Sequence, residues 1–258
     1  MRYHGGKTRI GKYISEKILK LIEISNPKID GYMEPFCGMC GVLVHVVEKS
    51  DLKSYVAWDT NASVIKMWKS LIKGWKPDIK NFDENRFYSI KGDGNSSAEK
   101  GFFGHAMTFG ALYFQNYRPE LINLLEYSSN DVVKRSQKMN CVTFHACDYK
   151  SILQENISNN VIYCDPPYER RSRYYNELNE LLLFNSNEFW RTCGDLSENN
   201  IVVISENKSF FDNRLKKYTG KKVITELPTH KNRFGASEQK SGEYLGIITM
   251  LDICLDGI

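Results

Sequence analysis

The chain of 258 residues has no apolar run that approaches the length of a membrane-spanning helix. Its first residues also lack the apolar stretch that a secretion signal needs. The chain also lacks a large excess of either charge. It has 35 Lys and Arg residues and 31 Asp and Glu residues, which give a net charge of +4. We therefore expect an intracellular protein that is not secreted and has no membrane partner. This mild charge permits binding to nucleic acid without requiring it.

A disulfide framework is missing too. The seven cysteines are odd in number and irregular in spacing, which indicates a reducing compartment. Cys37 and Cys40 form a Cys-x-x-Cys motif, but no second motif of this kind is present to complete a zinc site. We therefore expect no metal, and a metal or redox role for this pair is the less favoured alternative.

Internal repeats and low-complexity tracts are also absent, and a hydrophobic content of 41% is typical of a folded protein. Short apolar runs predict strands at 31–36, 54–58, 141–146, 161–164, 201–205, 222–226 and 244–253. Helical spacing predicts helices at 8–24, 40–49, 61–73 and 101–115, with one or two more between 177 and 198. This alternation is typical of an α/β fold, a mostly parallel sheet with helices on both faces, whose last strands pair at one edge.

The string Asp165-Pro166-Pro167-Tyr168 is the most informative motif of the chain. It follows an apolar run that reads as a buried strand, so it lies at the carboxyl edge of the sheet, where open α/β folds bind ligands. A carboxylate and the stiffly held carbonyl of Pro166 can accept both hydrogens of an exocyclic amine and localise its lone pair. Tyr168 can then stack on the base. The alternative is an ordinary turn, which also favours Asp and Pro.

Two further motifs precede it in the chain. Glu34 to Gly41 form a glycine-bearing turn between a predicted strand and a predicted helix, and Asp59 ends the next strand 21 positions after Gly38. This is the spacing of a nucleotide-binding βαβ unit, in which the acid accepts from a ribose hydroxyl. At the N-terminus, Gly5-Gly6-Lys7 precede a predicted helix and can bring backbone amides and an ammonium to an anion such as a carboxylate.

Together these motifs resemble the Dam-like, alpha-type family of adenine-specific DNA methyltransferases with a DPPY motif. The likeness spans residues 1–75 and 140–252 and includes Val202 to Ser205 and Gly242 to Leu245. It implies a Rossmann-like fold that uses S-adenosyl-L-methionine, with Asp165, Pro166 and Tyr168 as catalytic residues. It implies cofactor binding by Tyr3, Lys7, Phe36, Gly38, Asp59, Asp148 and Asp165. Cys40 stands where the family usually has glycine, which puts the local backbone or the cofactor affinity in question.

Residues 76–139 match the family poorly and occupy the place of its target-recognition region. Aromatic, amide and arginine side chains alternate here, and such side chains read bases in the major groove, so we expect DNA contacts from Gln115, Asn116 and Arg118. The alternative is a helical cap over the substrate cleft. Two basic segments suit a phosphate backbone and are predicted to bind DNA through Arg170, Arg171, Arg173, Lys231 and Arg233. Their alternative is a solvated surface.

The sequence therefore predicts a site-specific enzyme that methylates the N6 amine of adenine in double-stranded DNA after flipping the base from the duplex. Residues 1–75 and 140–258 form the expected catalytic domain, and 76–139 form a mainly helical target-recognition subdomain. The alternatives are an RNA adenine or cytosine-N4 methyltransferase and a catalytically silent nucleic-acid-binding module. The recognition sequence, the oligomeric state and a companion restriction endonuclease stay open, and GATC is not assumed.

Overall fold

The computed structural model describes residues 1, 3, 5–25, 28–154, 157–168, 174–175, 181–182, 184–228 and 243–255. The predicted DNA contacts at Arg170, Arg171, Arg173, Lys231 and Arg233 lie outside these residues. Within them, no helix combines the length and the apolar character that crossing a membrane requires.

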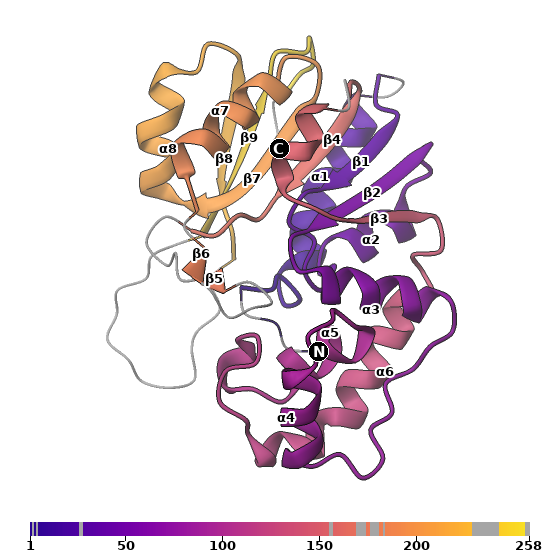
Figure 1. Cartoon of the computed structure of the whole chain (residues 1–258). Coiled ribbons are helices and arrows are strands. Elements are labelled where there is room, and N and C mark those ends of the chain that lie inside the picture. The colour runs from indigo at the N-terminus through magenta and orange to yellow at the C-terminus, as the bar shows by residue number, and fades with distance from the viewer. Residues whose placement is uncertain are drawn as a thin grey trace.

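A mixed sheet of seven strands forms the centre of the protein (Figure 1). Its strands run in the order β3-β2-β1-β4-β7-β9-β8, in which β9 is antiparallel to both neighbours and the other pairings are parallel. The strands are β1 Gly31–Glu34, β2 Ser54–Asp59, β3 Val142–Ala146, β4 Asn160–Cys164, β7 Ile201–Asn207, β8 Lys221–Glu226 and β9 Glu243–Thr249. A separate two-stranded pair joins β5 Tyr174–Tyr175 and β6 Leu181–Leu182.

Both faces of this sheet are covered, because the central strands β1 and β4 are buried at every position. Along β4, Val161 and Tyr163 belong to one hydrophobic cluster, whereas Ile162 and Cys164 belong to the other. Successive side chains of a strand point to opposite faces, so each cluster fills one face. All five positions of β4 are buried, as a parallel strand in the middle of an α/β sheet requires.

Helices form the layers on either side of the sheet. The helices α1 Gly11–Ser25, α2 Leu43–Lys49 and α3 Ala62–Ile72 contribute to one hydrophobic cluster. The helices α7 Ser186–Leu196 and α8 Lys208–Arg214, with the 3-10 segments η3 Tyr149–Gln154 and η4 Leu215–Lys217, contribute to the other. The predicted mostly parallel sheet with helices on both faces is therefore confirmed, and the antiparallel pair of β8 and β9 closes one edge.

A group of helices below the sheet in Figure 1 comes from residues 76–139. It contains α4 Glu84–Gly92, α5 Ala98–Ala106, η1 Phe109–Ala111, η2 Pro119–Leu124 and α6 Leu125–Ser136. The helix α5 packs tightly on α3 at Gly101, because a Cβ at Gly101 would lie only 2.2 Å from the carbonyl oxygen of Ser63. This close approach joins the helical group to the helix that follows β2.

The helix predicted at 101–115 is wrong at both ends. It begins at Ala98, where the Ser97 side chain caps it by accepting from the Lys100 amide at 3.1 Å. It ends at Ala106, because Gly110, Ala111 and Phe114 have positive φ angles of 61°, 56° and 46° that a right-handed helix does not tolerate. The sequence analysis made no prediction of α4, α6 or α8. The strand predicted at 244–253 is too long, because β9 ends at Thr249, four residues earlier.

Candidate active site

The three strands that lead into the motifs, β2, β1 and β4, are neighbours in the interior of the sheet. The chain runs from β1 outward through β2 to β3 and then returns to β4 on the other side of β1. Such a reversal opens a crevice beyond the carboxyl ends of β1 and β4, and open α/β sheets bind ligands there. Asp59 ends β2, Glu34 ends β1 and Asp165 follows β4. Two strand spacings, about 10 Å, therefore separate the strands that carry Asp59 and Asp165.

A cluster of four polar side chains surrounds Asp165, and we call Lys7, Asp165, Tyr168 and Glu243 the Asp165 cluster. The ammonium of Lys7 lies 2.6 Å from Asp165 Oδ1 and 2.9 Å from Glu243 Oε1, and it also donates to the Gly5 carbonyl at 3.2 Å. The Tyr168 hydroxyl donates to Glu243 Oε1. Lys7 Nζ lies 5.0 Å from the centre of the Tyr168 ring. The structure thus joins the N-terminal motif to the Asp-Pro-Pro-Tyr motif.

Burial and charge set the protonation of this cluster. Burial raises the pKa of Asp165 to about 6, although Lys7 acts against this, and Glu243 adds to the rise. For Lys7, burial acts to lower the pKa, but the two carboxylates outweigh it and raise the pKa above its ordinary value. Burial raises the pKa of Tyr168 well above its ordinary value, so its hydroxyl stays protonated. The Lys7 ammonium thus lies between the carboxyl groups of Asp165 and Glu243.

Glu34 lies beneath this cluster and is a second buried acid. Its carboxyl group accepts from the Tyr32 hydroxyl at 2.6 Å, and it is 2% exposed. Burial raises the pKa of Glu34 to about 8, the Tyr32 hydrogen bond opposes the rise, and the charge of Asp165 adds to it. Glu34 therefore carries its proton at neutral pH and adds no negative charge beside Asp165.

The glycine turn after β1 is held open by contacts on both sides of Gly38. Its amide donates to Asp59 Oδ2 at 2.9 Å, and its carbonyl accepts from Trp68 Nε1 at 2.8 Å. Gly38 has a φ of +43°, and a Cβ here would lie 2.8 Å from the Tyr3 ring. Asp59 Oδ1 also accepts from the Asn61 amide at 2.8 Å. The predicted cofactor residues Tyr3, Gly38 and Asp59 therefore meet in one turn.

Cys40 occupies a left-handed backbone position in the same turn, with a φ of +52°. This conformation favours glycine, which explains why a glycine suits this place, and Cys40 adopts the same conformation. Cys37 and Cys40 are both buried free thiols, and burial raises the pKa of each. Among the described residues no group of three or more His, Cys, Asp or Glu side chains is arranged to hold a metal ion.

Phe36 and Asp148 also lie near the carboxyl ends of β1 and β3. Phe36 is half-buried in an aromatic group, with its ring centre 5.3 Å from that of Tyr149 and 5.7 Å from that of Phe189. Asp148 is exposed, and its Oδ1 accepts from the Lys150 amide at 2.9 Å. The contacts of Phe36 are therefore aromatic packing, and the hydrogen bond of Asp148 belongs to a local turn.

The predicted base-reading residues lie in the loop between α5 and η2. An isolated bridge between Thr108 and Tyr117 closes this loop. Asn116 is exposed and Gln115 is half-buried. The guanidinium of Arg118, whose side chain is 40% exposed, lies 4.9 Å from the ring centre of Phe109.

The helical group also touches the glycine turn. The Tyr3 ring centre lies 4.6 Å from that of His105 on α5, and Arg135 on α6 donates to the Met39 carbonyl at 3.2 Å. Arg135 is itself held by Asp131 through an ion pair of 2.8 Å. Sequence reasoning missed these contacts, because nothing in the local pattern links residues 76–139 to the turn.

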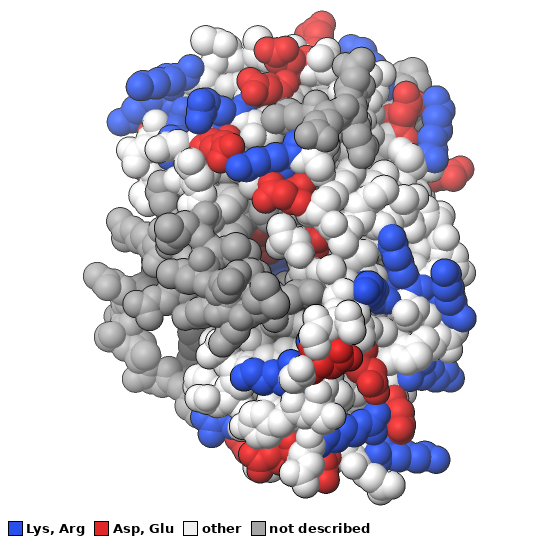
Figure 2. Space-filling model, viewed as in Figure 1, with Lys and Arg blue, Asp and Glu red and all other residues white. Residues whose placement is uncertain are grey.

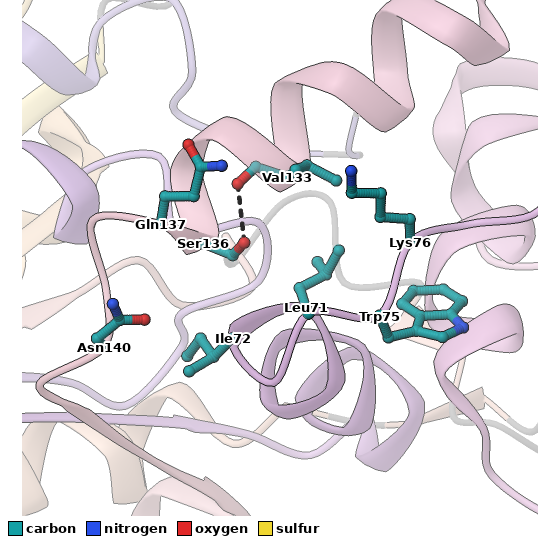
Figure 3. A pocket seen from close by; sticks show the side chains of 9 residues that line it. Leu71, Ile72, Trp75, Lys76, Val133, Ser136, Gln137 and Asn140 are labelled. Carbon is teal, nitrogen blue, oxygen red and sulfur yellow. Dashed lines mark hydrogen bonds between the residues drawn. The ribbon is translucent and has the colours of Figure 1, made fainter.

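Figure 2 shows that Lys and Arg side chains of the described residues alternate with Asp and Glu side chains on the face it presents, without forming one basic surface. A pocket of about 200 Å³ lies between the end of α3 and α6, with Leu71, Trp75 and Ser136 among the residues that line it (Figure 3). In its wall, Ser136 Oγ donates to the Val133 carbonyl at 2.8 Å. No member of the Asp165 cluster lines this pocket, so it is separate from the candidate site.

Glu243 is the site residue that sequence reasoning did not single out. It starts β9, and the antiparallel register pairs it with Asn207 at the end of β7. An acid at the start of an antiparallel last strand thereby reaches the edge where the parallel strands end. The position of Glu243 at the start of a predicted last strand could have indicated a site residue. This position becomes informative only once the direction of β9 in the sheet is known.

Comparison with known proteins gives a family and several relatives. The D12 class N6 adenine-specific DNA methyltransferase family matches residues 3–104 and 111–224. This match includes most of residues 76–139, which corrects the expectation that the likeness is confined to residues 1–75 and 140–252. The retron Ec67 DNA adenine methylase of Escherichia coli is 26% identical over 195 residues, which cover 66% of this chain and 63% of that protein. This chain thus spans less than two thirds of that relative.

Solved structures show a more distant likeness. A METTL16 methyltransferase domain aligns with a TM-score of 0.48 at 8% identity, covering 96% of this chain and 70% of that one. The human methyltransferase 10 domain containing protein aligns with a TM-score of 0.45 at 6% identity, covering 94% of this chain and 83% of that one.

Proposed function

The chain belongs to the D12 class N6 adenine-specific DNA methyltransferase family, and from this premise we propose that it methylates the N6 amine of adenine in double-stranded DNA. The methyl donor is S-adenosyl-L-methionine. The observation that carries the proposal is the Asp165 cluster, which lies at the switch point of the sheet. The Asp165 carboxylate, which is held by the Lys7 ammonium and lies beside the tethered Tyr168, suits a substrate with an amine and a flat ring.

The glycine turn fits the proposed donor. Because Gly38 has no Cβ, the Tyr3 ring packs directly against the backbone of the turn, so the aromatic ring and the backbone are both present where the donor is expected to bind. Asp59 accepts from the backbone amides of Gly38 and Asn61, which hold its carboxylate at the turn, and a carboxylate is the group that accepts from a ribose hydroxyl in nucleotide-binding βαβ units. We therefore assign donor binding to Tyr3, Gly38 and Asp59, with Phe36 and Asp148 at the neighbouring strand ends and with Lys7 and Asp165 facing the crevice.

The chain's own residues prepare the amine for transfer. S-adenosyl-L-methionine supplies an electrophilic methyl group on a sulfonium, whose sulfur keeps the bonding electrons when the methyl group leaves. The carboxylate of Asp165 accepts one amine hydrogen and the Pro166 carbonyl accepts the other, so the lone pair localises on N6. N6 bonds to the methyl carbon and then releases its extra proton toward Asp165. Because the target atom is inaccessible in a duplex, the base is flipped and stacks on Tyr168.

The helical group of residues 76–139 is our proposed target-recognition subdomain, and 1–75 with 140–258 form the proposed catalytic domain. The exposed Asn116 and the accessible Arg118 support this assignment, because both side chains can read base edges in the major groove. Gln115 lies in the same loop, but its side chain is half-buried and therefore less accessible to DNA than an exposed side chain. With DNA as the substrate, we place the enzyme in the compartment that holds its DNA.

The test is methyl transfer with labelled S-adenosyl-L-methionine and a set of alternative substrates. Random duplex DNA, single-stranded DNA and structured RNA are offered separately, and the digested nucleosides are then identified. We expect label in N6-methyladenine from duplex DNA. Label in N4-methylcytosine, or in RNA alone, would replace the proposal with one of the alternative methyltransferases. Binding of donor and DNA without any transfer would identify a catalytically silent module.

A further inference from the structure

We propose that Glu243 is a positioning residue of the methyl-transfer site, which holds the Tyr168 hydroxyl and the Lys7 ammonium so that the Tyr168 ring and the Asp165 carboxylate face the target amine. This inference rests on the proposed function. Glu243 contacts Tyr168 of the Asp-Pro-Pro-Tyr motif and Lys7 of the Gly-Gly-Lys motif, although it belongs to neither motif.

The backbone fixes Glu243 where it is needed. Glu243 pairs with Asn207 in the register between β9 and β7, and its carbonyl accepts from the Leu227 amide at 2.9 Å. The residue is therefore held between the end of β7 and the residue after β8. Its side chain starts from the same sheet edge as Asp165, and it is 30% exposed, so it borders the crevice without being sealed in the core.

One oxygen of Glu243 serves two partners. Oε1 lies 2.9 Å from Lys7 Nζ and accepts from the Tyr168 hydroxyl. Tyr168 is then restrained at both ends, by the rigid Pro166-Pro167 pair in the backbone and by Glu243 at the hydroxyl. A stacking ring that is fixed in this way does not have to be ordered when the base arrives, and small misplacements of such groups cost large factors in rate.

The contact with Lys7 acts on Asp165. Lys7 Nζ lies 2.6 Å from Asp165 Oδ1, so this ammonium competes with the target amine for the carboxylate. Glu243 takes a share of the same ammonium and leaves Asp165 a better acceptor. Without Glu243, the Lys7 charge would rest on Asp165 and on the Gly5 carbonyl alone.

The experiment compares Glu243→Ala, Glu243→Gln, Tyr168→Phe and the double variant Glu243→Ala/Tyr168→Phe with the wild type under single turnover. Glu226→Ala is the matched control, because Glu226 is an exposed acid at the end of β8, beside β9. Wild-type formation of N6-methyladenine is measured first, and its absence would overturn the proposed function itself. The rate of methyl transfer and the affinities for donor and DNA are then measured separately.

We expect Glu243→Ala to lower the rate of methyl transfer by about 10- to 100-fold while both affinities stay within about threefold. Glu243→Gln keeps an oxygen that accepts from Tyr168, so it should recover most of the rate. The double variant should be no slower than the slower single variant, because one contact has been removed twice. A Glu243→Ala rate within about twofold of wild type, or single losses that multiply, would overturn the proposal.

The pH dependence of the methyl-transfer rate tests the role of Glu243 even if the Glu243→Ala variant does not fold. The charged and titratable groups that act on Asp165 or that Asp165 acts on are Lys7, Glu34, Tyr163, Tyr168 and Glu243. Glu243 is one of the groups that raise the pKa of Asp165, so Glu243→Gln should move the acid limb of the methyl-transfer rate to lower pH. A residue that only stabilises the end of β9 would leave this limb in place, and an unmoved limb would refute the proposed role.

Discussion

Replacing Glu34 by glutamine should change how the stability of the protein depends on pH. Glu34 is 2% exposed, and burial raises its pKa from 4.5 to about 8. The folded state thus binds the Glu34 proton more tightly than the unfolded state. Stability from this group is fully present below the unfolded pKa and is lost as pH rises through the folded pKa.

The size of the effect follows from the same shift. A rise from 4.5 to about 8 corresponds to about 5 kcal/mol in total, at 1.36 kcal/mol for each pKa unit. About 3 kcal/mol of this loss falls between pH 6 and pH 9, because the folded group releases its proton only near the upper end of that window. Glutamine keeps an oxygen that accepts from Tyr32 but has no proton to release.

The assay is urea unfolding of the wild type and Glu34→Gln at pH 6 and pH 9. We expect the wild type to lose about 3 kcal/mol more than the variant between these two conditions. Glu226→Gln, the same change at an exposed position, should follow the wild type. If wild type and Glu34→Gln lose stability equally, Glu34 is ionised in the folded protein and our account of the crevice charge is wrong.

Three further changes test other parts of the site. Gly38→Ala places a Cβ 2.8 Å from the Tyr3 ring at a φ of +43°, so donor affinity measured by calorimetry should fall at least about tenfold; unchanged affinity would place the donor elsewhere. Lys7→Met removes the charge that lowers the pKa of Asp165, so that pKa should rise above 6 and the acid limb of methyl transfer should move to higher pH; an unmoved limb would contradict the Lys7–Asp165 pair. Arg118→Ala should broaden the methylated sites in a randomised duplex library, because a bidentate base contact contributes about 1–3 kcal/mol of discrimination; a uniform loss across all sequences would indicate a phosphate contact instead.

The family and the main elements of the sheet could be predicted because their signals are local. Apolar runs that end in an acid gave β2 and β4, and the family match confirms the resemblance inferred from the three motifs. The periodic Ile14, Ile18 and Leu21 are buried in α1, as their spacing predicts. Such patterns lie within a short stretch of sequence, so they can be recognised without knowing which strands pair in the sheet.

The rest of the site depends on contacts between distant parts of the chain. Lys7 was expected to face an anion of the ligand, and in the structure its ammonium lies on Asp165, 158 positions away. Glu243 reaches the site through the antiparallel pairing of β9, a direction that its own sequence does not reveal. The end of α5 was missed for another reason, because the positive φ angles at Ala111 and Phe114 are imposed on residues that do not favour them.

The most direct test of the account is the single-turnover rate of methyl transfer to adenine by Asp165→Asn. Asparagine keeps the shape of the side chain and removes the negative charge that accepts from the amine, so the rate should fall by about 100-fold or more. DNA affinity should stay near that of the wild type, and Asp195→Asn, at an exposed position of α7, should methylate normally. A rate for Asp165→Asn close to that of the wild type would contradict the central claim that this carboxylate carries the chemistry.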